Sequence, residues 1–297
     1  MISFRGCYTA IVTPFSADGS TVDFERLEEH IRVQANGRVA GVVPCGTTGE
    51  SPTLSEIEHC EVFERTLAIA RPLGLAVIAG AGSNNTNHAI HLHKFAAAAG
   101  ADAALQVNPY YNKPSQEGLY RHFMAIAESA DLPIVLYNIP GRTGVALAPA
   151  TVERLAKHPN IRAIKEATGS LDSASEILQR CDIALLSGDD SLTLPFASVG
   201  GVGVVSVVSN ILPARVQALC DAFNGNDWTK ARSIHRELFA ICRGLLSLDT
   251  NPIPIKAAME LLGRDRGVLR LPMCRAAEGA IAEVRKLLTT AGMLRGT

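Results

Sequence analysis

Short apolar segments alternate with longer amphipathic segments along most of the chain. Segments of strand length dominated by apolar residues occur at 7–15, 39–46, 75–82, 101–109, 132–140, 161–167, 183–190 and 201–210. Continuous apolar runs of this length, bounded by turn residues, are typical of strands that are buried on both faces. The pattern therefore predicts eight buried strands.

The stretches between these strands carry apolar residues at helical spacing, and several begin with a serine or threonine that can cap a helix. Clear examples are residues 55–70, 86–99 and 115–130. A regular alternation of eight strands with helices favours a closed parallel barrel over an open doubly wound sheet. We therefore predict an α/β fold, a (β/α)8 TIM barrel of residues 1–225.

Helical patterns continue beyond the last predicted strand, at residues 213–223, 227–246, 253–262 and 274–291. We assign the last three of these segments to a C-terminal helical extension of residues 226–297. The chain of 297 residues is therefore expected to contain a catalytic barrel followed by this extension.

The charge of the chain is nearly balanced, with 28 basic and 29 acidic residues. A balanced charge provides no basic surface for nucleic acid or an anionic membrane, so a small-molecule partner is expected. No apolar run has the length of a membrane span, which predicts a cytoplasmic protein. The seven cysteines show no CxxC spacing, so neither disulfides nor structural zinc are expected.

Polar or turn residues follow the predicted strands. They are found at 13–14, 46–48, 80–82, 108–110, 137–138, 165–166, 188–189 and 209–210. In a parallel barrel the carboxyl ends of all the strands meet at one rim, where active sites are built. These residues are therefore the first candidates for a functional site.

Lys165 interrupts the apolar pattern of the sixth strand. Strand alternation places Ile161, Ala163 and Lys165 on one face, and if the small Ala163 faces inward, Lys165 points into the mouth of the barrel. Burial there disfavours the ammonium form, and a neutral amine can attack a carbonyl. The alternative is a lysine that reaches solvent or pairs with a carboxylate such as Asp189.

Three other features at the ends of the second and fifth strands offer groups suited to a Schiff-base reaction. Tyr137, in the neighbouring strand, is either a proton donor or an ordinary aromatic of the rim. The glycine-rich run 45–51, CGTTGES, either holds a carboxylate with its amides and hydroxyls or forms a capped turn. Arg142 follows the fifth strand, where it either binds a carboxylate with both arms of its guanidinium or remains an exposed surface residue.

Six motifs of the chain resemble the dihydrodipicolinate synthase family. They are GTTGES, NPYYNKPSQEGLY, YNIPGRTG, IKEATG, SGDD and NPIPIKAAM, and the resemblance covers residues 6–288. This family belongs to a wider group of pyruvate-dependent class I aldolases and lyases with (β/α)8 barrels. The pairs Thr47-Thr48 and Tyr110-Tyr111, together with Arg142, favour the synthases, since sialic acid lyases typically carry a serine-threonine version of the first pair.

The resemblance implies a reaction and a set of residues for it. Lys165 would form a Schiff base with pyruvate, whose carboxylate would be held by Thr48 and neighbouring amides. Tyr137, Thr47 and Tyr111 would relay protons. The enzyme would condense pyruvate with L-aspartate 4-semialdehyde to give 4-hydroxy-tetrahydrodipicolinate, in lysine and diaminopimelate biosynthesis.

Further expectations concern the second substrate and the assembly. Arg142 would hold the carboxylate of L-aspartate 4-semialdehyde, and Gly188 and Val205 would line the pocket mainly through their backbone. Neither a metal nor an organic cofactor is implied. Family members are usually homotetramers built as dimers of dimers, in which the second tyrosine, Tyr111 here, reaches into the site of the partner.

Many family members are inhibited by L-lysine, which binds at the dimer interface. The matching residues here are Ser51, Glu56, His59, Asn84, His88 and Tyr110. Lysine-sensitive bacterial relatives typically carry histidine at the position of Glu56 and glutamate at the position of His88, so the two residue types are exchanged here. Without a carboxylate at residue 88, the ligand ammonium lacks a charge-assisted hydrogen bond, and we expect weak or absent inhibition.

Two other functions remain open on the sequence. Another pyruvate-dependent aldolase, such as N-acetylneuraminate lyase or a keto-deoxy sugar acid aldolase, would use the same lysine, tyrosine and threonine loop. The non-enzymatic alternative is a barrel that has lost catalysis and binds a small oxo acid as a sensor. Turnover with pyruvate and varied aldehydes separates these possibilities.

Overall fold

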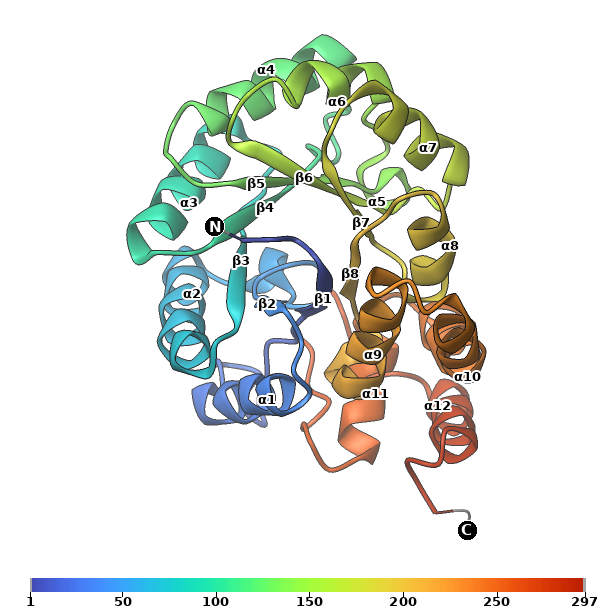
Figure 1. The fold of residues 1–297 in the computed structure, drawn as a ribbon. Coiled ribbons are helices and arrows are strands. Elements are labelled where there is room, and N and C mark those ends of the chain that lie inside the picture. The colour runs from blue at the N-terminus through green and yellow to red at the C-terminus, as the bar shows by residue number, and fades with distance from the viewer. Residues whose placement is uncertain (1, 296–297) are drawn as a thin grey trace.

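A computed structural model describes residues 2–295 of the chain. Its strands form one closed parallel barrel in sequential order (Figure 1). They are β1 (Gly6–Ala10), β2 (Gly41–Val43), β3 (Ala76–Gly80), β4 (Ala103–Val107), β5 (Ile134–Asn138), β6 (Ile161–Glu166), β7 (Ala184–Ser187) and β8 (Gly203–Ser206). The predicted (β/α)8 TIM barrel is thus confirmed.

Helices surround the barrel and continue beyond it. Those of the barrel are α1 (Phe24–Asn36), α2 (Glu56–Ala70), α3 (Thr86–Ala99), α4 (Gln116–Ala127), α5 (Pro140–Thr143), α6 (Pro149–Leu155), α7 (Leu171–Arg180), α8 (Thr193–Ser198) and α9 (Pro213–Asn224). They are followed by α10 (Trp228–Leu248), α11 (Ile253–Leu261) and α12 (Glu278–Thr290). Short 3-10 turns are η1 (Ser51–Thr53), η2 (Arg71–Leu73), η3 (Asp190–Leu192) and η4 (Val208–Asn210).

The strands are apolar on both faces because each face packs against a different layer. Tyr8, Val135 and Leu186 belong to a cluster that fills the barrel interior. Ile134 and Leu185 belong to a cluster with residues of the surrounding helices. Continuous apolar runs, rather than alternating ones, are what such two-sided burial requires.

The last three helices share an apolar core with the barrel. Phe223 of α9, Leu238 of α10, Met259 of α11 and Leu288 of α12 lie in one buried cluster. Figure 1 shows α10 beside α9, and α12 packs against α10 and α11. The division of the chain at residues 225 and 226 stays a prediction, since the core runs across it.

Several predicted elements, among them the final helix and the eighth strand, differ from the structure at their ends. The final helix begins at Glu278 rather than at Cys274, after Ala277 in an extended conformation. Before it, Arg275 forms an ion pair with Glu260 of α11. The eighth strand ends at Ser206, since the buried Asp190 carboxylate accepts hydrogen bonds from the next two backbone amides, 2.9 and 3.0 Å long.

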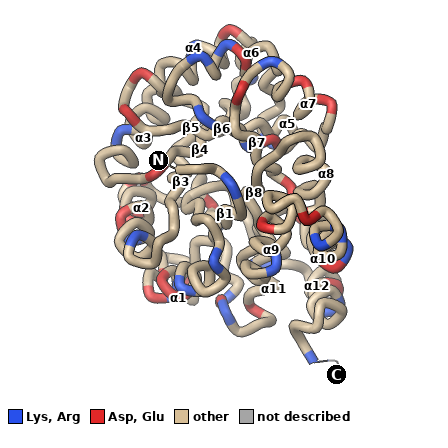
Figure 2. The backbone as a smooth tube through the Cα atoms, in the orientation of Figure 1, with Lys and Arg blue, Asp and Glu red and all other residues tan. Residues whose placement is uncertain are grey.

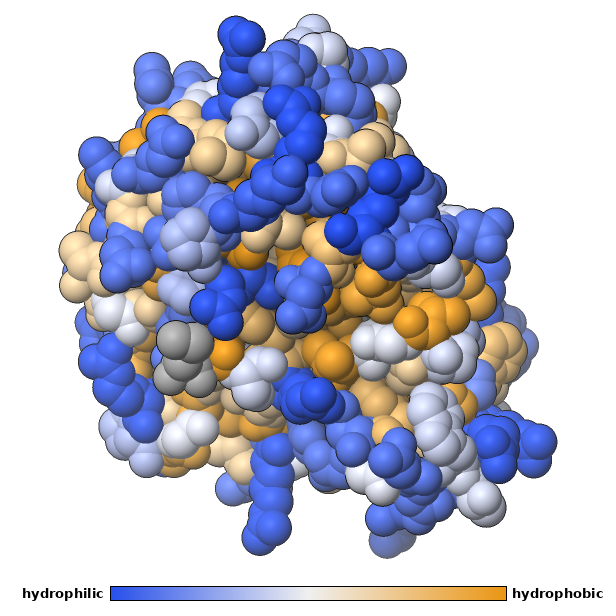
Figure 3. Space-filling view, turned by 45° about the horizontal axis from the view of Figure 1, so that its top comes forward, coloured by the Kyte–Doolittle hydropathy of each residue, from blue (hydrophilic) through white to orange (hydrophobic). Residues whose placement is uncertain are grey.

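Charged residues of both signs are interspersed around the outer helices (Figure 2). The face drawn in Figure 3 is largely hydrophilic, with apolar residues gathered toward its centre. Among residues 2–295, none of the helices combines the length and apolar character required to cross a membrane.

Candidate active site

A cavity of about 780 Å³ lies at the carboxyl end of the barrel. Its lining includes six of the predicted site residues: Thr47, Thr48, Tyr137, Arg142, Lys165 and Gly188. These residues come from the ends of β2, β5, β6 and β7 or from the loops that follow, so the convergence predicted for the strand ends is confirmed.

Lys165 is buried at the base of this cavity, with 6% of its surface exposed. Residues Tyr137 and Lys165 are direct partners across the β5 and β6 pair. The Nζ atom of Lys165 lies 4.0 Å from the ring centroid of Tyr137. The ion pairs recorded for residues 2–295 do not include one between Lys165 and Asp189, although both line the cavity. Lys165 therefore faces Tyr137 rather than a carboxylate.

A β-bulge at the start of β6 sets the direction of this lysine. Ile134 of β5 pairs with Ile161, whereas the next residue, Val135, pairs with Ala163. Ile161 packs in the outer cluster, and Ala163 packs inside the barrel. The prediction that Ile161 shares a face with Lys165 was therefore wrong, because the extra residue in the bulge reverses the alternation. In a regular strand without the bulge, Ile161 and Lys165 would lie on the same face, so an outward Ile161 would place Lys165 outside the barrel as well.

The next residue, Glu166, faces away from the cavity and is fully buried. Its carboxylate accepts hydrogen bonds from the Asn138 side chain, at 3.0 Å, and from the backbone amide of Thr168, at 2.9 Å. Burial raises the pKa of Glu166 above its ordinary value, despite these two donors. Asn138 also accepts from the backbone amide of Leu147 at 2.9 Å, so this network ties β6 to the chain that follows Arg142.

The threonine loop after β2 is held tightly against the barrel. The Thr13 hydroxyl donates to the Gly49 carbonyl at 2.7 Å. A Cβ at Gly80 would lie 2.3 Å from the carbonyl oxygen of Cys45, so only glycine permits this approach of β3 to the loop. Thr48 is buried and Thr47 is half-buried at the cavity wall.

Arg142 lies at the rim in α5 and is exposed. Its Nη2 donates to the main-chain carbonyl of Asn251 at 3.0 Å. This guanidinium lines the cavity and retains further donors for an anion, which fits the predicted role in carboxylate binding.

The C-terminal extension supplies one wall of the cavity, which sequence reasoning missed. The lining residues from this part of the chain are Arg243, Leu246, Ser247, Asp249, Thr250 and Asn251. The motif NPIPIKAAM was the available signal, since Asn251 is its first residue. Asn251 also contacts the threonine loop, since its amide Nδ2 donates a hydrogen bond to Oγ1 of Thr48 at 3.0 Å.

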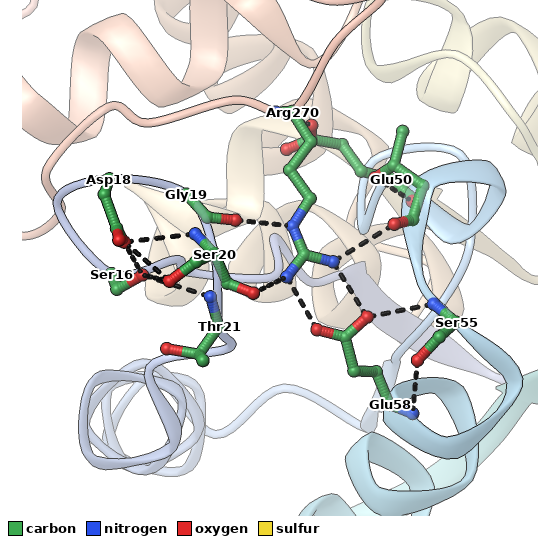
Figure 4. Close-up of polar contacts among 10 residues, drawn as sticks. Ser16, Asp18, Gly19, Ser20, Thr21, Glu50, Ser55, Glu58 and Arg270 are labelled. Atoms are coloured by element: carbon green, nitrogen blue, oxygen red, sulfur yellow. Dashed lines mark hydrogen bonds and ion pairs between the residues drawn. The ribbon is translucent and has the colours of Figure 1, made fainter.

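Ionic contacts attach the segment after α11 to the helix that follows the threonine loop. The guanidinium of Arg270 donates to both carboxylate oxygens of Glu58, at 2.9 and 2.6 Å, and to the carbonyls of Gly19 and Ser20 (Figure 4). The Arg270 hydrogen bonds lower the pKa of Glu58 to about 2. The backbone amide of Arg270 donates to Glu50 at 3.1 Å, within the loop itself.

Two predicted site residues do not line the cavity. Tyr111 is 90% exposed, with a backbone φ of 74°. Val205 is buried inside the barrel, and Val207 lines the cavity from the same part of the chain. The predicted roles of Tyr111 and Val205 stay predictions.

A second cavity of about 380 Å³ adjoins the first, and Thr47 and Arg142 line both. Five residues of the predicted regulatory set line it: Ser51, Glu56, His59, His88 and Tyr110. Asn84 does not, and its side chain instead donates to the Tyr110 carbonyl at 3.2 Å. Glu56 lies 3.0 Å from Nε2 of His91, which draws this carboxylate toward α3.

His59 has the most defined environment in the second cavity. Its Nε2 lies 2.9 Å from the Gly80 carbonyl oxygen, and its ring packs edge-on against Phe63. Burial lowers the pKa of His59 below its ordinary value. The imidazole therefore stays neutral near pH 7 and contributes a hydrogen-bonding wall rather than a charge.

A closed parallel barrel whose polar groups gather at the carboxyl ends of its strands defines the class of (β/α)8-barrel enzymes. Within this class, the chain belongs to the dihydrodipicolinate synthetase family, whose pattern matches residues 3–291.

Individual relatives match over almost their whole length. A protein of Nitratidesulfovibrio vulgaris named 4-hydroxy-tetrahydrodipicolinate synthase is 48% identical, over 99% of this chain and 100% of the relative. The solved 4-hydroxy-tetrahydrodipicolinate synthase of Methylacidiphilum fumariolicum is 45% identical, with a TM-score of 0.94 over 97% of this chain and 96% of that one. The chloride-inhibited dihydrodipicolinate synthase of Acinetobacter baumannii, complexed with pyruvate, is 40% identical, with a TM-score of 0.95 over 98% and 100% of the two chains.

Proposed function

We propose that this chain condenses pyruvate with L-aspartate 4-semialdehyde through a Schiff base on Lys165. The product would be 4-hydroxy-tetrahydrodipicolinate, an intermediate of lysine and diaminopimelate biosynthesis. The observation that carries the proposal is a buried lysine at a barrel strand end, with Nζ 4.0 Å from the ring centroid of Tyr137. The names of the relatives support it, as does the pyruvate bound by the protein of A. baumannii.

The chemistry begins with the free amine of Lys165, which attacks the C2 carbonyl of pyruvate. The resulting carbinolamine loses water to give an iminium, and loss of a C3 proton then gives an enamine. C3 of the enamine forms the new bond to the aldehyde carbon of the second substrate. The amino group of that substrate attacks C2, displaces the lysine amine and closes the ring.

Each of these steps moves a proton, and residues with hydroxyl groups line the cavity beside Lys165. Tyr137 faces Lys165 directly, and Thr47 lies on the wall shared by the two cavities. We assign proton transfer to these two residues, with Tyr111 as the third member of the relay.

Two carboxylates must be bound, one from each substrate. The buried Thr48 and the backbone amides of its loop would hold the carboxylate of pyruvate. Arg142, at the rim, would hold that of the aldehyde. Gly188 would line the pocket through its backbone, and Val205 would contribute from the barrel interior below.

The position of Tyr111 bears on the assembly. Tyr111 is 90% exposed and does not line the cavity that contains Lys165. We assign its phenol to the site of a neighbouring subunit, in a homotetramer built as a dimer of dimers.

Trapping the Schiff base tests the mechanism. Borohydride added with pyruvate should leave a reduced adduct on the peptide that contains Lys165, and Lys165→Ala should abolish it. Lys94→Ala, at an exposed lysine of α3, is the matched control and should keep the adduct. An unmodified Lys165 peptide in the active protein would refute the mechanism.

A coupled assay in which only the aldehyde varies tests the reaction. Turnover of L-aspartate 4-semialdehyde, without turnover of sugar-derived aldehydes, is expected. Preference for N-acetylmannosamine or a sugar acid aldehyde would instead assign the chain to the other aldolases. A protein that binds pyruvate but turns over no aldehyde would be a sensor.

A further inference from the structure

Asn251 occupies the connection between α10 and α11, where the C-terminal extension meets the cavity. Its amide Nδ2 donates to Oγ1 of Thr48 at 3.0 Å. Its main-chain carbonyl accepts from Nη2 of Arg142 at 3.0 Å. One residue therefore contacts both groups that are assigned to the two substrate carboxylates.

The direction of the first hydrogen bond matters for Thr48. A hydroxyl has one proton to donate and two lone pairs that accept, whereas a carboxylate only accepts. Because Asn251 donates to Thr48, it uses a lone pair and leaves the hydroxyl proton available for an anion. An acceptor in place of Nδ2 would compete with the substrate for that proton.

The surrounding contacts hold Asn251 against this loop. Lys256, one turn into α11, is fully buried, with Nζ 2.5 Å from a carboxylate oxygen of Glu50. The same Nζ donates to the carbonyl of Thr13, in the loop after β1, at 2.8 Å. Glu50 belongs to the loop that carries Thr48, so a buried ion pair links the start of α11 to that loop. Supporting contacts of this kind fix the geometry of a binding group.

We propose that Asn251 is a positioning residue that orients the Thr48 hydroxyl toward the carboxylate of the oxo-acid substrate, while its main-chain carbonyl holds Arg142 at the rim. This inference rests on the proposed function and adds the extension to the substrate-binding machinery. It predicts that the side chain of Asn251 supports the binding of pyruvate through Thr48. Its main-chain carbonyl would support the binding of the aldehyde through Arg142.

The side chain and main chain can be separated by substitution. Asn251→Ala removes the donor to Thr48 but keeps the carbonyl that binds Arg142. The KM for pyruvate should rise roughly 3- to 10-fold, in the range expected for one lost hydrogen bond, and the KM for the aldehyde should stay within about twofold. Asn87→Ala, at an exposed asparagine of α3 outside the cavity lining, is the matched control and should change neither value.

Asn251→Asp is the second variant, since it keeps the size of the side chain. Its carboxylate accepts the Thr48 proton and repels the substrate anion, so the KM for pyruvate should rise further than in Asn251→Ala. Urea unfolding of each variant checks that the fold is retained. An unchanged KM for pyruvate in either folded variant would overturn the proposal.

A double-mutant cycle tests whether Asn251 acts through Thr48. In a Thr48→Val background, Asn251→Ala should cause no further rise in the KM for pyruvate. In a Thr48→Ser background, which keeps the hydroxyl, the 3- to 10-fold effect should remain. Equal effects in both backgrounds would show that Asn251 acts by another route, and the positioning role would fall.

Failure of the proposed function and failure of the positioning role give different results. If the wild-type protein forms no borohydride adduct with pyruvate and shows no turnover, the proposed function fails. If the adduct and turnover are present but the KM for pyruvate does not respond to Asn251→Ala, only the positioning role fails.

Discussion

Lys165 and Tyr137 sit on adjacent strands and are register partners, so main-chain hydrogen bonds of the barrel fix their separation. Groups held by strands are placed more rigidly than groups carried by loops. Arg142 differs, because it lies in the short helix α5 at the rim and is exposed. At the scale of single residues, the proposed nucleophile is thus preorganised, while the proposed binding group for the second substrate remains accessible to solvent.

Arg142→Ala is expected to weaken the aldehyde substrate selectively. A lost charge-assisted contact corresponds to roughly 1.5–3 kcal/mol, and solvent exposure favours the lower end of that range. The KM for L-aspartate 4-semialdehyde should therefore rise about 10-fold or more, while borohydride trapping of pyruvate stays intact. Arg121→Ala, at an exposed arginine of α4, is the control. An unchanged KM for the aldehyde would place its carboxylate elsewhere.

At the scale of elements, the layer formed by α3 and α4 contains two buried histidines. His93 of α3 lies near Gln106 of β4, with 3.4 Å between side-chain nitrogens, and Nδ1 of His122 in α4 lies 2.9 Å from the Thr86 hydroxyl. Burial lowers the pKa of each histidine to about 4. Both imidazoles are therefore neutral in the folded protein at pH 7, and protonating them opposes the packing of this layer.

For this reason the free energy of unfolding of the protein should decrease as the pH is lowered. The folded-state pKa of each histidine lies below its unfolded value of about 6.5, so the unfolded chain binds more protons between the two values. The contribution is complete above pH 6.5 and decreases as the pH falls toward 4, by roughly 2 kcal/mol per histidine at pH 5.

Urea unfolding of His122→Gln measures this effect. Glutamine does not titrate, so the free energy of unfolding of the variant should change less between pH 7 and pH 5 than that of the wild-type protein. His158→Gln, at a histidine outside this layer, serves as the control and should keep the pH dependence of the wild type. Parallel curves for wild type and His122→Gln would contradict the assignment.

At the scale of the whole molecule, the family resemblance predicts that Tyr111, which is exposed in the single chain, completes the site of a second subunit. Tyr111→Phe and Lys165→Ala should each abolish most activity alone. Hybrid dimers of the two variants should recover part of it, since one of the two sites then contains both wild-type residues. Hybrid formation is confirmed by native mass spectrometry, and a lack of recovery in confirmed hybrids would remove Tyr111 from the relay.

The second cavity leads to a prediction about L-lysine. His88 lines it without adding a carboxylate, and Glu56 is drawn toward His91, so the ammonium of lysine would lack its charged partner. We expect weak or absent inhibition when L-lysine is titrated into the coupled assay. The exchange Glu56→His with His88→Glu should increase sensitivity. Strong inhibition of the wild type at submillimolar lysine would show that the present charges form a competent site.

The sequence by itself determined the barrel and the strand ends that surround the cavity. Apolar runs on both faces and helical spacing between them are local properties, so they identify the elements without knowledge of their neighbours. The motifs around Lys165, Tyr137 and Thr48 were recognisable for the same reason, since each is a short stretch at the end of one strand. The residues predicted for a regulatory pocket, except Asn84, line one cavity, and their regulatory role stays a prediction.

Only the tertiary structure decided the features that depend on distant partners. The bulge at β6 is a mismatch in pairing with β5, so the sequence of β6 alone could not show that Ile161 faces outward while Lys165 faces inward. Asn251 contacts Thr48 across 203 positions of the sequence. The apolar pattern of the helical extension identifies the buried face of each helix but not the part of the barrel against which it packs. Strand order and long-range docking are set by packing between elements, and that packing is what brings these residues into one site.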